Sequence, residues 1–162
     1  MKKLKIYLDT SVISYLLAED TPEKMADTHK LWEQIKAGEY NVALSTVTLD
    51  ELNRCPEPKR QQLIRFIDQI NFEMQTITDD SLTLAEKFID FGILRKKSMD
   101  DCQHLAAAIL SGSDVVVSWN FKHIVNAKTI KGMRIITTAE GYKDVIICSP
   151  TMLIEGEEND ED

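Results

Sequence analysis

Short runs of aliphatic and β-branched residues alternate with longer segments of helical periodicity along most of the chain. The short runs predict five strands, in LKIYLD (4–9), NVALST (41–46), FEMQTI (72–77), DVVVSW (114–119) and DVIICSP (144–150). Segments of helical spacing lie between them, at 10–19, 21–40, 47–55, 57–70, 79–94 and 98–112. This alternation predicts βαβ units, and so an α/β fold whose mainly parallel sheet is covered on both faces.

Length and charge define the body of the protein. The 162 residues suffice for one domain with a sizeable core, expected over 1–154. The last eight residues, EGEENDED (155–162), contain six acids and no base, and we expect them to form a solvated, disordered tail. Most of the net charge of −8 comes from this tail. A nearly balanced body disfavours a general nucleic-acid coat protein but permits a basic rim around an acidic cleft.

The chain carries no sign of a membrane or secretory protein. No apolar run approaches the roughly 20 residues of a membrane span, and the N-terminus MKKLKIYLD does not resemble a signal peptide. Cys55, Cys102 and Cys148 are far apart and include no C-x-x-C pair. Reduced thiols and a cytoplasmic location are therefore expected.

Polar residues occur in the sequence where the predicted strands end and the next segment begins. Asp9 ends the first strand, Asp50 and Glu51 follow the second within two helical turns, and Asn120 follows VVVSW. Ligands of open α/β sheets collect beyond the carboxyl ends of the strands. Another acidic pair, Asp100–Asp101, opens the helix that leads into VVVSW.

Helical phase selects one acid from each pair. Asp101 borders the apolar stripe of its helix, whereas Asp100 falls further round, in line with His104. We therefore favour Asp101 as the inward acid. By phase His104 points near the same site, but we expect it to lie on the helix surface or to pack. Glu51 lies one turn after Val47 and is favoured over Asp50 in the same way.

Helix capping is the alternative role for each acid alone. Thr48-x-x-Glu51 and Ser98-x-x-Asp101 both have capping-box spacing. Asp9 differs, because Thr10 and Ser11 already offer caps. Three acids converging on one sheet edge would repel one another unless a divalent cation neutralised them, and oxygen ligands suit Mg²⁺ or Mn²⁺.

Two roles remain possible for several other polar and aromatic residues. Five cations near the acids either contact phosphates or form a solvated face, and they are Arg95, Lys96, Lys97, Lys122 and Lys128. His123 is a further candidate for contact with a ligand. Trp119 either stacks on a base or packs beneath the site, Trp32 is expected in the core, and His29 on the surface.

Several longer strings resemble the PIN domain family, and within it the VapC-like toxin ribonucleases. The resemblance rests on YLDTSVISYL, STVTLDELNR, GYKDVIICSPTML and above all DDCQHLAAAILSGSDVVVSWNFKHIVN, which marks a subgroup. Together these strings extend from residue 4 to about 154. The resemblance implies a three-layer α/β/α sandwich and a nuclease that cuts RNA with divalent metal held by acids.

Carried over by position, the resemblance gives Asp9, Glu51 and Asp101 as metal ligands and catalytic residues. It implies Asp9 as the central ligand and the other two as flanking ligands. Where the family has a fourth acid after the VVVS strand, this chain has Asn120, which would position a metal-bound water or a phosphate. Lys97, Lys122 and His123 are the expected RNA contacts. A cognate antitoxin and a homodimer are the partners that the resemblance implies.

Two alternatives stay open beside the metal-dependent endoribonuclease. One is a PIN-like module that binds RNA or protein and has lost turnover, as Asn120 could indicate. The other is a phosphatase with Asp9 as nucleophile, but such enzymes usually have a second aspartate two residues later, where this chain has Ser11.

Overall fold

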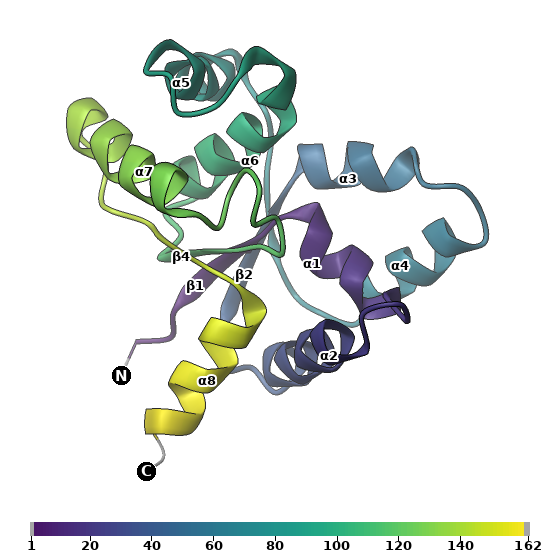
Figure 1. Cartoon of the computed structure of the whole chain (residues 1–162). Helices are drawn as coiled ribbons and strands as arrows, with labels where there is room; N and C mark the ends of the chain where they lie inside the picture. Colours follow the sequence, from purple (N-terminus) through teal and green to yellow (C-terminus); the bar gives the residue numbers. More distant parts are fainter. Residues whose placement is uncertain (1, 161–162) are drawn as a thin grey trace.

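A five-stranded parallel sheet forms the centre of the protein in a computed structural model that describes residues 2–160 (Figure 1). The strands are β1 (Lys5–Leu8), β2 (Asn41–Ser45), β3 (Glu73–Gln75), β4 (Val115–Val117) and β5 (Ile146–Cys148), in the order β3-β2-β1-β4-β5. The helices are α1 (Thr10–Ser14), α2 (Pro22–Lys36), α3 (Thr46–Asn53), α4 (Lys59–Ile67), α5 (Asp79–Asp90), α6 (Met99–Leu110), α7 (Ala127–Glu140) and α8 (Pro150–Asp160), with short 3₁₀ segments at Tyr15–Leu17 and Lys96–Ser98. The α/β/α fold class expected from the sequence is confirmed.

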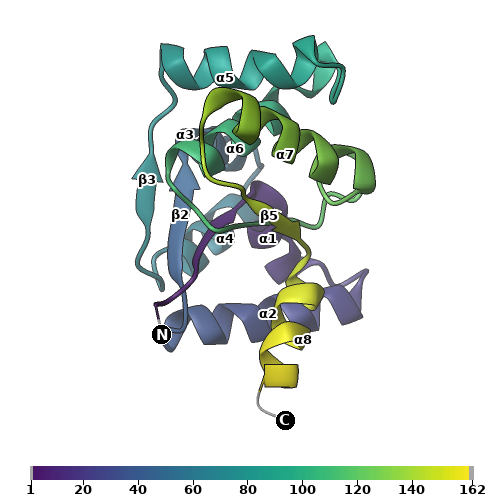
Figure 2. The same ribbon diagram turned by 90° about the vertical axis from the view of Figure 1, so that its left-hand side faces the viewer.

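Strand alternation divides the core into two layers. Ile6 and Leu8 of β1 pack into one apolar cluster, which includes side chains of α1, α2, α4 and α8. Tyr7, between them, joins the opposite cluster, which includes side chains of α5, α6 and α7. Figure 2 shows these two groups of helices on opposite sides of the sheet. The period of two along a strand is what sends neighbouring residues to different layers.

The central position of β1 fixes the place of its carboxyl end. β1 pairs in parallel with β2 on one side and with β4 on the other, with Tyr7 opposite Ala43 and Val116. The carboxyl ends of these three strands therefore lie next to one another. Residues that follow directly, such as Asp9 and Ser118, are brought to one edge.

Two helices lie outside the segments for which helical spacing predicts a helix. α7 is rich in β-branched residues and contains Gly132, so its sequence has little helical signature. Gly132 allows close packing, because a Cβ there would lie 2.6 Å from side-chain atoms of Ile93. Tertiary packing thus determines this helix more than local propensity does.

The C-terminal helix α8 packs beside α2. Ile154 is buried in the first cluster, and Thr151 Oγ1 donates to Asp27 Oδ2 at 2.5 Å. The helix continues to Asp160, through most of the acidic segment that was expected to be a disordered tail, while residues 161–162 lie outside the described part. The placement of Trp32 agrees with the sequence analysis, since its side chain is buried in the core.

Two features relate to compartment and environment. Cys55, Cys102 and Cys148 are free thiols, and burial raises the pKa of Cys102 and of Cys148 to about 12. Within residues 2–160, no helix has the length and apolar character required to cross a bilayer.

Candidate active site

Asp9 is a buried carboxylate at the carboxyl edge of the sheet. Its side chain is held by two hydroxyls, because Ser11 Oγ donates to Oδ1 and Ser118 Oγ to Oδ2, both at 2.5 Å. Asp9 is the N-cap residue of α1, but its side chain makes no capping hydrogen bond. Burial raises the pKa of Asp9, although the positive charge of His104 and the two serine hydrogen bonds act in the opposite direction. The carboxylate therefore does not act as the side-chain cap of α1.

Glu51 reaches the same edge from α3. It accepts a hydrogen bond from Thr10 Oγ1 at 3.1 Å, and its Oε1 lies 2.5 Å from His104 Nε2. The N-cap residue of α3 is Ser45, so the Thr48-x-x-Glu51 capping box does not form. Partial burial would raise the pKa of Glu51, but its hydrogen bond to His104 and the charge of that ring lower it overall.

His104 lies in the middle of the acids, and the expectation that it lies on the helix surface or only packs is wrong. Its side chain is buried, and its Nδ1 is 2.6 Å from Tyr7 Oη, which in turn is 2.7 Å from Ser45 Oγ. Burial lowers the pKa of His104, but the hydrogen bond to Glu51 and the charges of the acids outweigh it and raise the pKa. Those acids are Asp9, Glu51 and Asp101.

Helical phase pointed His104 toward the site but gave no reason to prefer a site role over packing, because α6 is buried nearly all round. Cys102 and the whole run 104–109 are inaccessible to solvent, so helical phase does not separate an inner face from an outer one. The available signal was chemical. A histidine one turn after Asp101 on an otherwise apolar helix must find a polar partner when it is buried.

Asp101 and Asn120 meet beside this cluster. Asn120 Nδ2 lies 3.4 Å from Asp101 Oδ1, and Asn120 Oδ1 accepts a hydrogen bond from the His123 backbone at 2.9 Å. Burial raises the pKa of Asp101, with smaller contributions from Asp9 and Glu51 in the same direction and from His104 and His123 against it. Ser98 makes no side-chain cap, so the second capping box is also absent.

Asp100 occupies a different environment from Asp101. Its Oδ2 lies 3.3 Å from the Arg54 guanidinium at the protein surface. The two neighbouring acids thus differ as helical phase predicted, with one at the cluster and one in a surface ion pair.

The fit of this cluster to a divalent cation can be judged from its donors. Within residues 2–160, no group of three or more His, Cys, Asp or Glu side chains is arranged as a ready-made metal site. Mg²⁺ does not need such a cage, since it is commonly held by one or two carboxylates together with waters and substrate phosphates. Asp9 and Asp101 both have raised pKa values, so a nearby positive charge would stabilise their ionised forms. Donor type and charge fit such an ion.

Cations from separate segments surround a small pocket next to Asn120. The pocket has a volume of about 140 Å³, and among the residues that line it are Arg95, Lys122, His123 and Lys128. Lys96 and Lys97 precede α6 and are exposed, but they do not line this pocket. The structure thus gathers three of the five cations that the sequence analysis selected, together with His123.

Trp119 packs beneath the site, in agreement with one of its two expected roles. It is only 4% exposed, stacks on Tyr15 with ring centroids 5.5 Å apart, and donates from Nε1 to Thr28 Oγ1 at 2.8 Å. Its backbone N–H donates to Ser11 Oγ at 2.9 Å, so Trp119 is hydrogen-bonded to the same hydroxyl that donates to Asp9.

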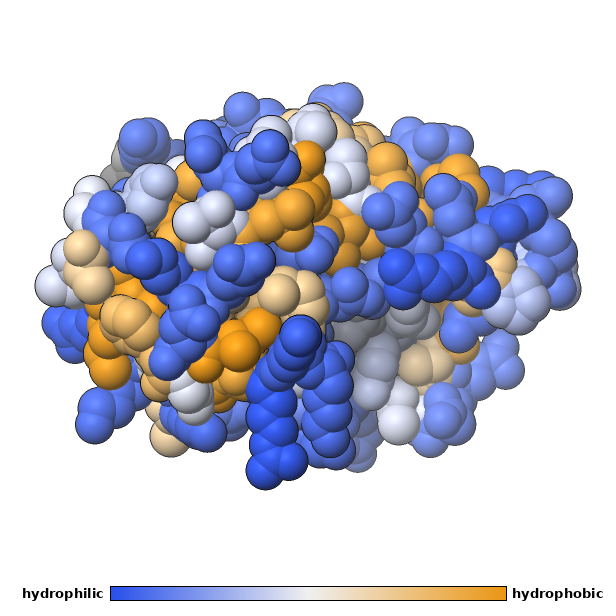
Figure 3. Space-filling model, turned by 90° about the horizontal axis from the view of Figure 1, so that it is seen from above, coloured by the Kyte–Doolittle hydropathy of each residue, from blue (hydrophilic) through white to orange (hydrophobic). Residues whose placement is uncertain are grey.

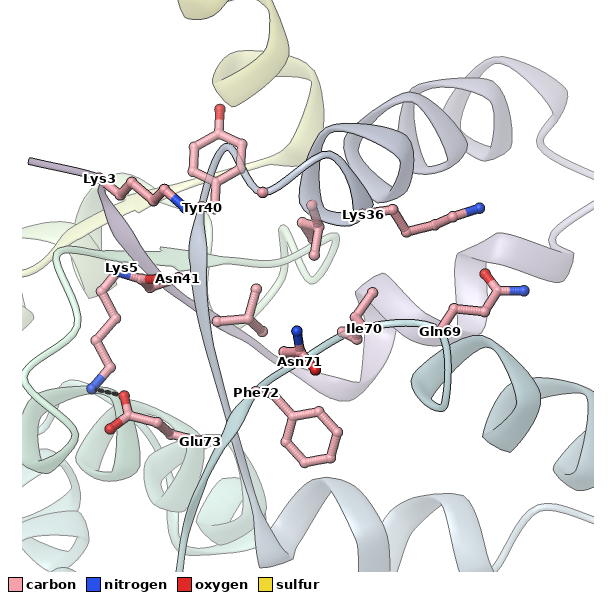
Figure 4. A pocket seen from close by; sticks show the side chains of 13 residues that line it. Lys3, Lys5, Lys36, Tyr40, Asn41, Gln69, Ile70, Asn71, Phe72 and Glu73 are labelled. Atoms are coloured by element: carbon pink, nitrogen blue, oxygen red, sulfur yellow. Dashed lines mark ion pairs between the residues drawn. The ribbon is translucent and has the colours of Figure 1, made fainter.

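A groove at the opposite edge of the sheet has different chemistry. It encloses about 680 Å³ near the amino ends of β1 and β2 and is lined by residues that include Lys5, Lys36 and Glu73 (Figure 4). Lys5 forms an ion pair with Glu73, and Lys36 lies 3.0 Å from Glu33. Its charges are largely satisfied internally, so the acid cluster remains the candidate site.

Comparison with known proteins identifies the family. The PIN domain family matches residues 6–123, a span that contains Asp9, Glu51, Asp101 and Asn120. The chain belongs to the PIN domain family. PIN domains are generally nucleases and usually use divalent metal ions, so the acidic edge lies where the chemistry of such a protein would be expected.

A solved structure supports the fold of this PIN domain. The chain is similar to one in the crystal structure of VapBC2 from Rickettsia felis bound to a DNA fragment from their promoter. The TM-score is 0.56 at 13% sequence identity, over 90% of this chain and 98% of that chain. No curated protein matches the sequence.

Proposed function

We propose that this PIN domain is a metal-dependent endoribonuclease and the toxin of a toxin–antitoxin pair. The observation that carries the proposal is the convergence of three acids from separate segments on one buried histidine, His104. None of the three forms the helix cap that would explain it locally. A cluster of this charge at the carboxyl edge of a parallel sheet suits phosphodiester hydrolysis with Mg²⁺ or Mn²⁺.

In this proposal each residue has a defined role. Asp9 is the central metal ligand, and Glu51 and Asp101 are the flanking ligands. The hydroxyls of Ser11 and Ser118 fix the orientation of Asp9. When bound, a divalent ion lowers the pKa of an attacking water and stabilises charge on the phosphoryl oxygens.

Asn120 then acts as a neutral positioning group. Its amide nitrogen is directed to Asp101, and its oxygen is held by the His123 backbone. It orients Asp101, and with it a water or a phosphate at the metal, without adding negative charge to the cluster.

The second candidate function is a PIN-like module that binds RNA or protein without turnover. Two observations favour it, namely the amide at position 120 and the hydrogen bond that holds Glu51 on His104. A phosphatase has no such support, because Ser11, at the position of the second aspartate, donates to Asp9.

An antitoxin protein and a second copy of the chain are the proposed partners, and the cytoplasm is the proposed location. The comparison with VapBC2 supports the antitoxin partner. Apolar patches are visible on the surface above α5 and α7 (Figure 3), and Phe91, Ile130 and Ile135 of this region are between 44% and 51% exposed. Such patches suit a protein–protein interface.

The test is cleavage of an RNA pool by the purified protein with Mn²⁺ and with EDTA. We expect cleavage with Mn²⁺ alone, its loss in Asp9→Asn, and its retention in the matched control Asp100→Asn, which alters only a surface ion pair. Binding of RNA without cleavage would support the inert module. Hydrolysis of a simple phosphomonoester in place of RNA would support the phosphatase.

A further inference from the structure

The side chains that line the cationic pocket beside Asn120 carry an excess of positive charge. Arg95, Lys122 and Lys128 line it together with His123, and no acidic side chain is among the lining residues. Within the described part of the chain, none of the three longer cations forms an ion pair. Charges of one sign gathered around a hollow repel one another unless an anion is bound.

The position of these cations relative to α7 strengthens the argument. Lys128 lies in the first turn of α7, which contains no acidic residue, and Lys122 shortly precedes that helix. The N-terminal end of a helix carries a partial positive charge, so lysines there oppose the helix dipole. Lys128 is therefore unfavourable at this place, and an anion bound there would offset the cost.

The loop that carries Lys122 and His123 is held rigidly in place. Asn126 Nδ2 donates to the carbonyl oxygens of Phe121 and Lys122 at 3.1 and 3.0 Å, and Thr129 Oγ1 donates to that of His123 at 2.7 Å. The backbone N–H of His123 is bound by Asn120. A loop whose backbone is fixed in this way presents its side chains with little further loss of entropy on binding.

The same loop connects the pocket to the acids. Asn120 contacts both Asp101 and the backbone of His123, and the charge of His123 acts on Asp101. The pocket has a volume of about 140 Å³. It is large enough for a phosphate group but too small for a whole nucleotide.

We propose that the pocket lined by Arg95, Lys122, His123 and Lys128 is a phosphate-binding subsite, separate from the acid cluster, that holds one phosphate of the nucleic-acid substrate. The inference rests on the proposed function for the identity of its ligand. The phosphate is either an internal phosphodiester next to the scissile bond or a terminal phosphomonoester. With that phosphate in the pocket, the adjacent part of the nucleic-acid chain lies beside Asp101.

The experiment measures binding without cleavage. A fluorescent 2′-O-methyl oligoribonucleotide is titrated with the protein in EDTA by anisotropy, at several salt concentrations, in 5′-phosphate and 5′-hydroxyl forms. We expect Lys128→Ala and Lys122→Ala each to weaken binding about threefold to tenfold and to reduce the log–log salt slope by about 0.7. Lys128→Arg should retain binding, because it keeps the charge.

The matched control is Lys131→Ala, which removes an exposed lysine from the same helix that does not line the pocket. Unchanged binding in Lys128→Ala, or an equal loss in Lys131→Ala, would overturn the subsite. Dependence on the 5′-phosphate identifies a terminal monoester, and its absence with the Lys128 effect intact identifies an internal diester.

The outcome is independent of the nuclease assay. A protein that binds through Lys128 but does not cleave RNA with Mn²⁺ would retain the subsite and lose the proposed function. A protein that cleaves RNA while Lys128→Ala and Lys131→Ala bind alike would retain the function and lose the subsite.

Discussion

His104 Nε2 lies 2.5 Å from Glu51 Oε1, so a buried imidazole is hydrogen-bonded within the acidic cluster. The ring comes from α6 and the carboxylate from α3, and the other ring nitrogen contacts Tyr7 in the central strand. Three elements are therefore joined by one imidazole. A protonated His104 partly neutralises the acids when no metal is bound, which makes a buried site of this charge tolerable in the free protein.

The stability of the metal-free protein should depend on pH through His104. Its pKa in the folded state is raised above the ordinary value of 6.5, because the hydrogen bond to Glu51 and the nearby acids outweigh burial. The stabilisation is therefore complete below pH 6.5 and is lost as the pH rises through the folded pKa. Urea unfolding in EDTA should show a free energy of unfolding that falls as the pH is raised above 6.5.

His104→Gln removes the titration and should flatten this dependence. His29→Gln is the matched control, since His29 bonds the Leu16 carbonyl far from the acids and should leave the profile unchanged. Parallel profiles for wild type and His104→Gln would contradict the assignment.

Asp9→Asn should stabilise the fold while abolishing cleavage. Burial raises the pKa of Asp9, so the folded state binds its proton more tightly than the unfolded state does. Ionisation at neutral pH therefore costs stability, progressively as pH rises from the acid range through the folded pKa. An uncharged amide avoids that cost, and we expect a gain of about 1 kcal/mol at pH 7, or about 2–4 °C in Tm for a chain of this size. A lower Tm by calorimetry in EDTA would refute this.

Asn120→Asp should make the protein more dependent on metal. The new carboxylate would face Asp101 Oδ1, where Asn120 Nδ2 now lies at 3.4 Å. We expect a loss of about 1 kcal/mol in EDTA from like-charge repulsion and a larger rise in Tm on adding Mn²⁺ than in the wild type. Asn71→Asp, in the groove at the opposite edge, is the control and should show no extra response to Mn²⁺. Equal Mn²⁺ responses in wild type and Asn120→Asp would place the metal elsewhere.

Gly132→Ala tests the packing that fixes α7. A Cβ at this position would lie 2.6 Å from Ile93 side-chain atoms, and overpacking of this kind costs about 1–3 kcal/mol. That cost should exceed the gain of about 1 kcal/mol that alanine brings in a helix interior. Gly156→Ala in α8 is the control, because nothing lies within 4 Å of its Cβ position. Denaturant midpoints should move in opposite directions for the two variants.

The strands, their parallel arrangement in one sheet and the residues at their ends were readable from the sequence. Alternating apolar runs and helical segments predict a parallel sheet because each pattern has its own period, and the position of Asp9 directly after β1 follows from that assignment. Helical phase also separated Asp101 from Asp100 correctly, because on α6 these two acids lie at the exposed end of the helix. Helix α7 could not be predicted in this way, since its β-branched residues and Gly132 conceal a helix that Ile93 and its neighbours stabilise.

The sequence by itself determined which acids are delivered to the carboxyl edge, because strand ends and helix starts are local features. Only the tertiary structure decided that His104 lies among them and that Arg95 and Lys128 share a pocket with Lys122 and His123. The physical reason is that burial and charge are sums over neighbours far apart in the chain. Local periodicity shows where a side chain points along its own helix, but not which opposing groups it meets there.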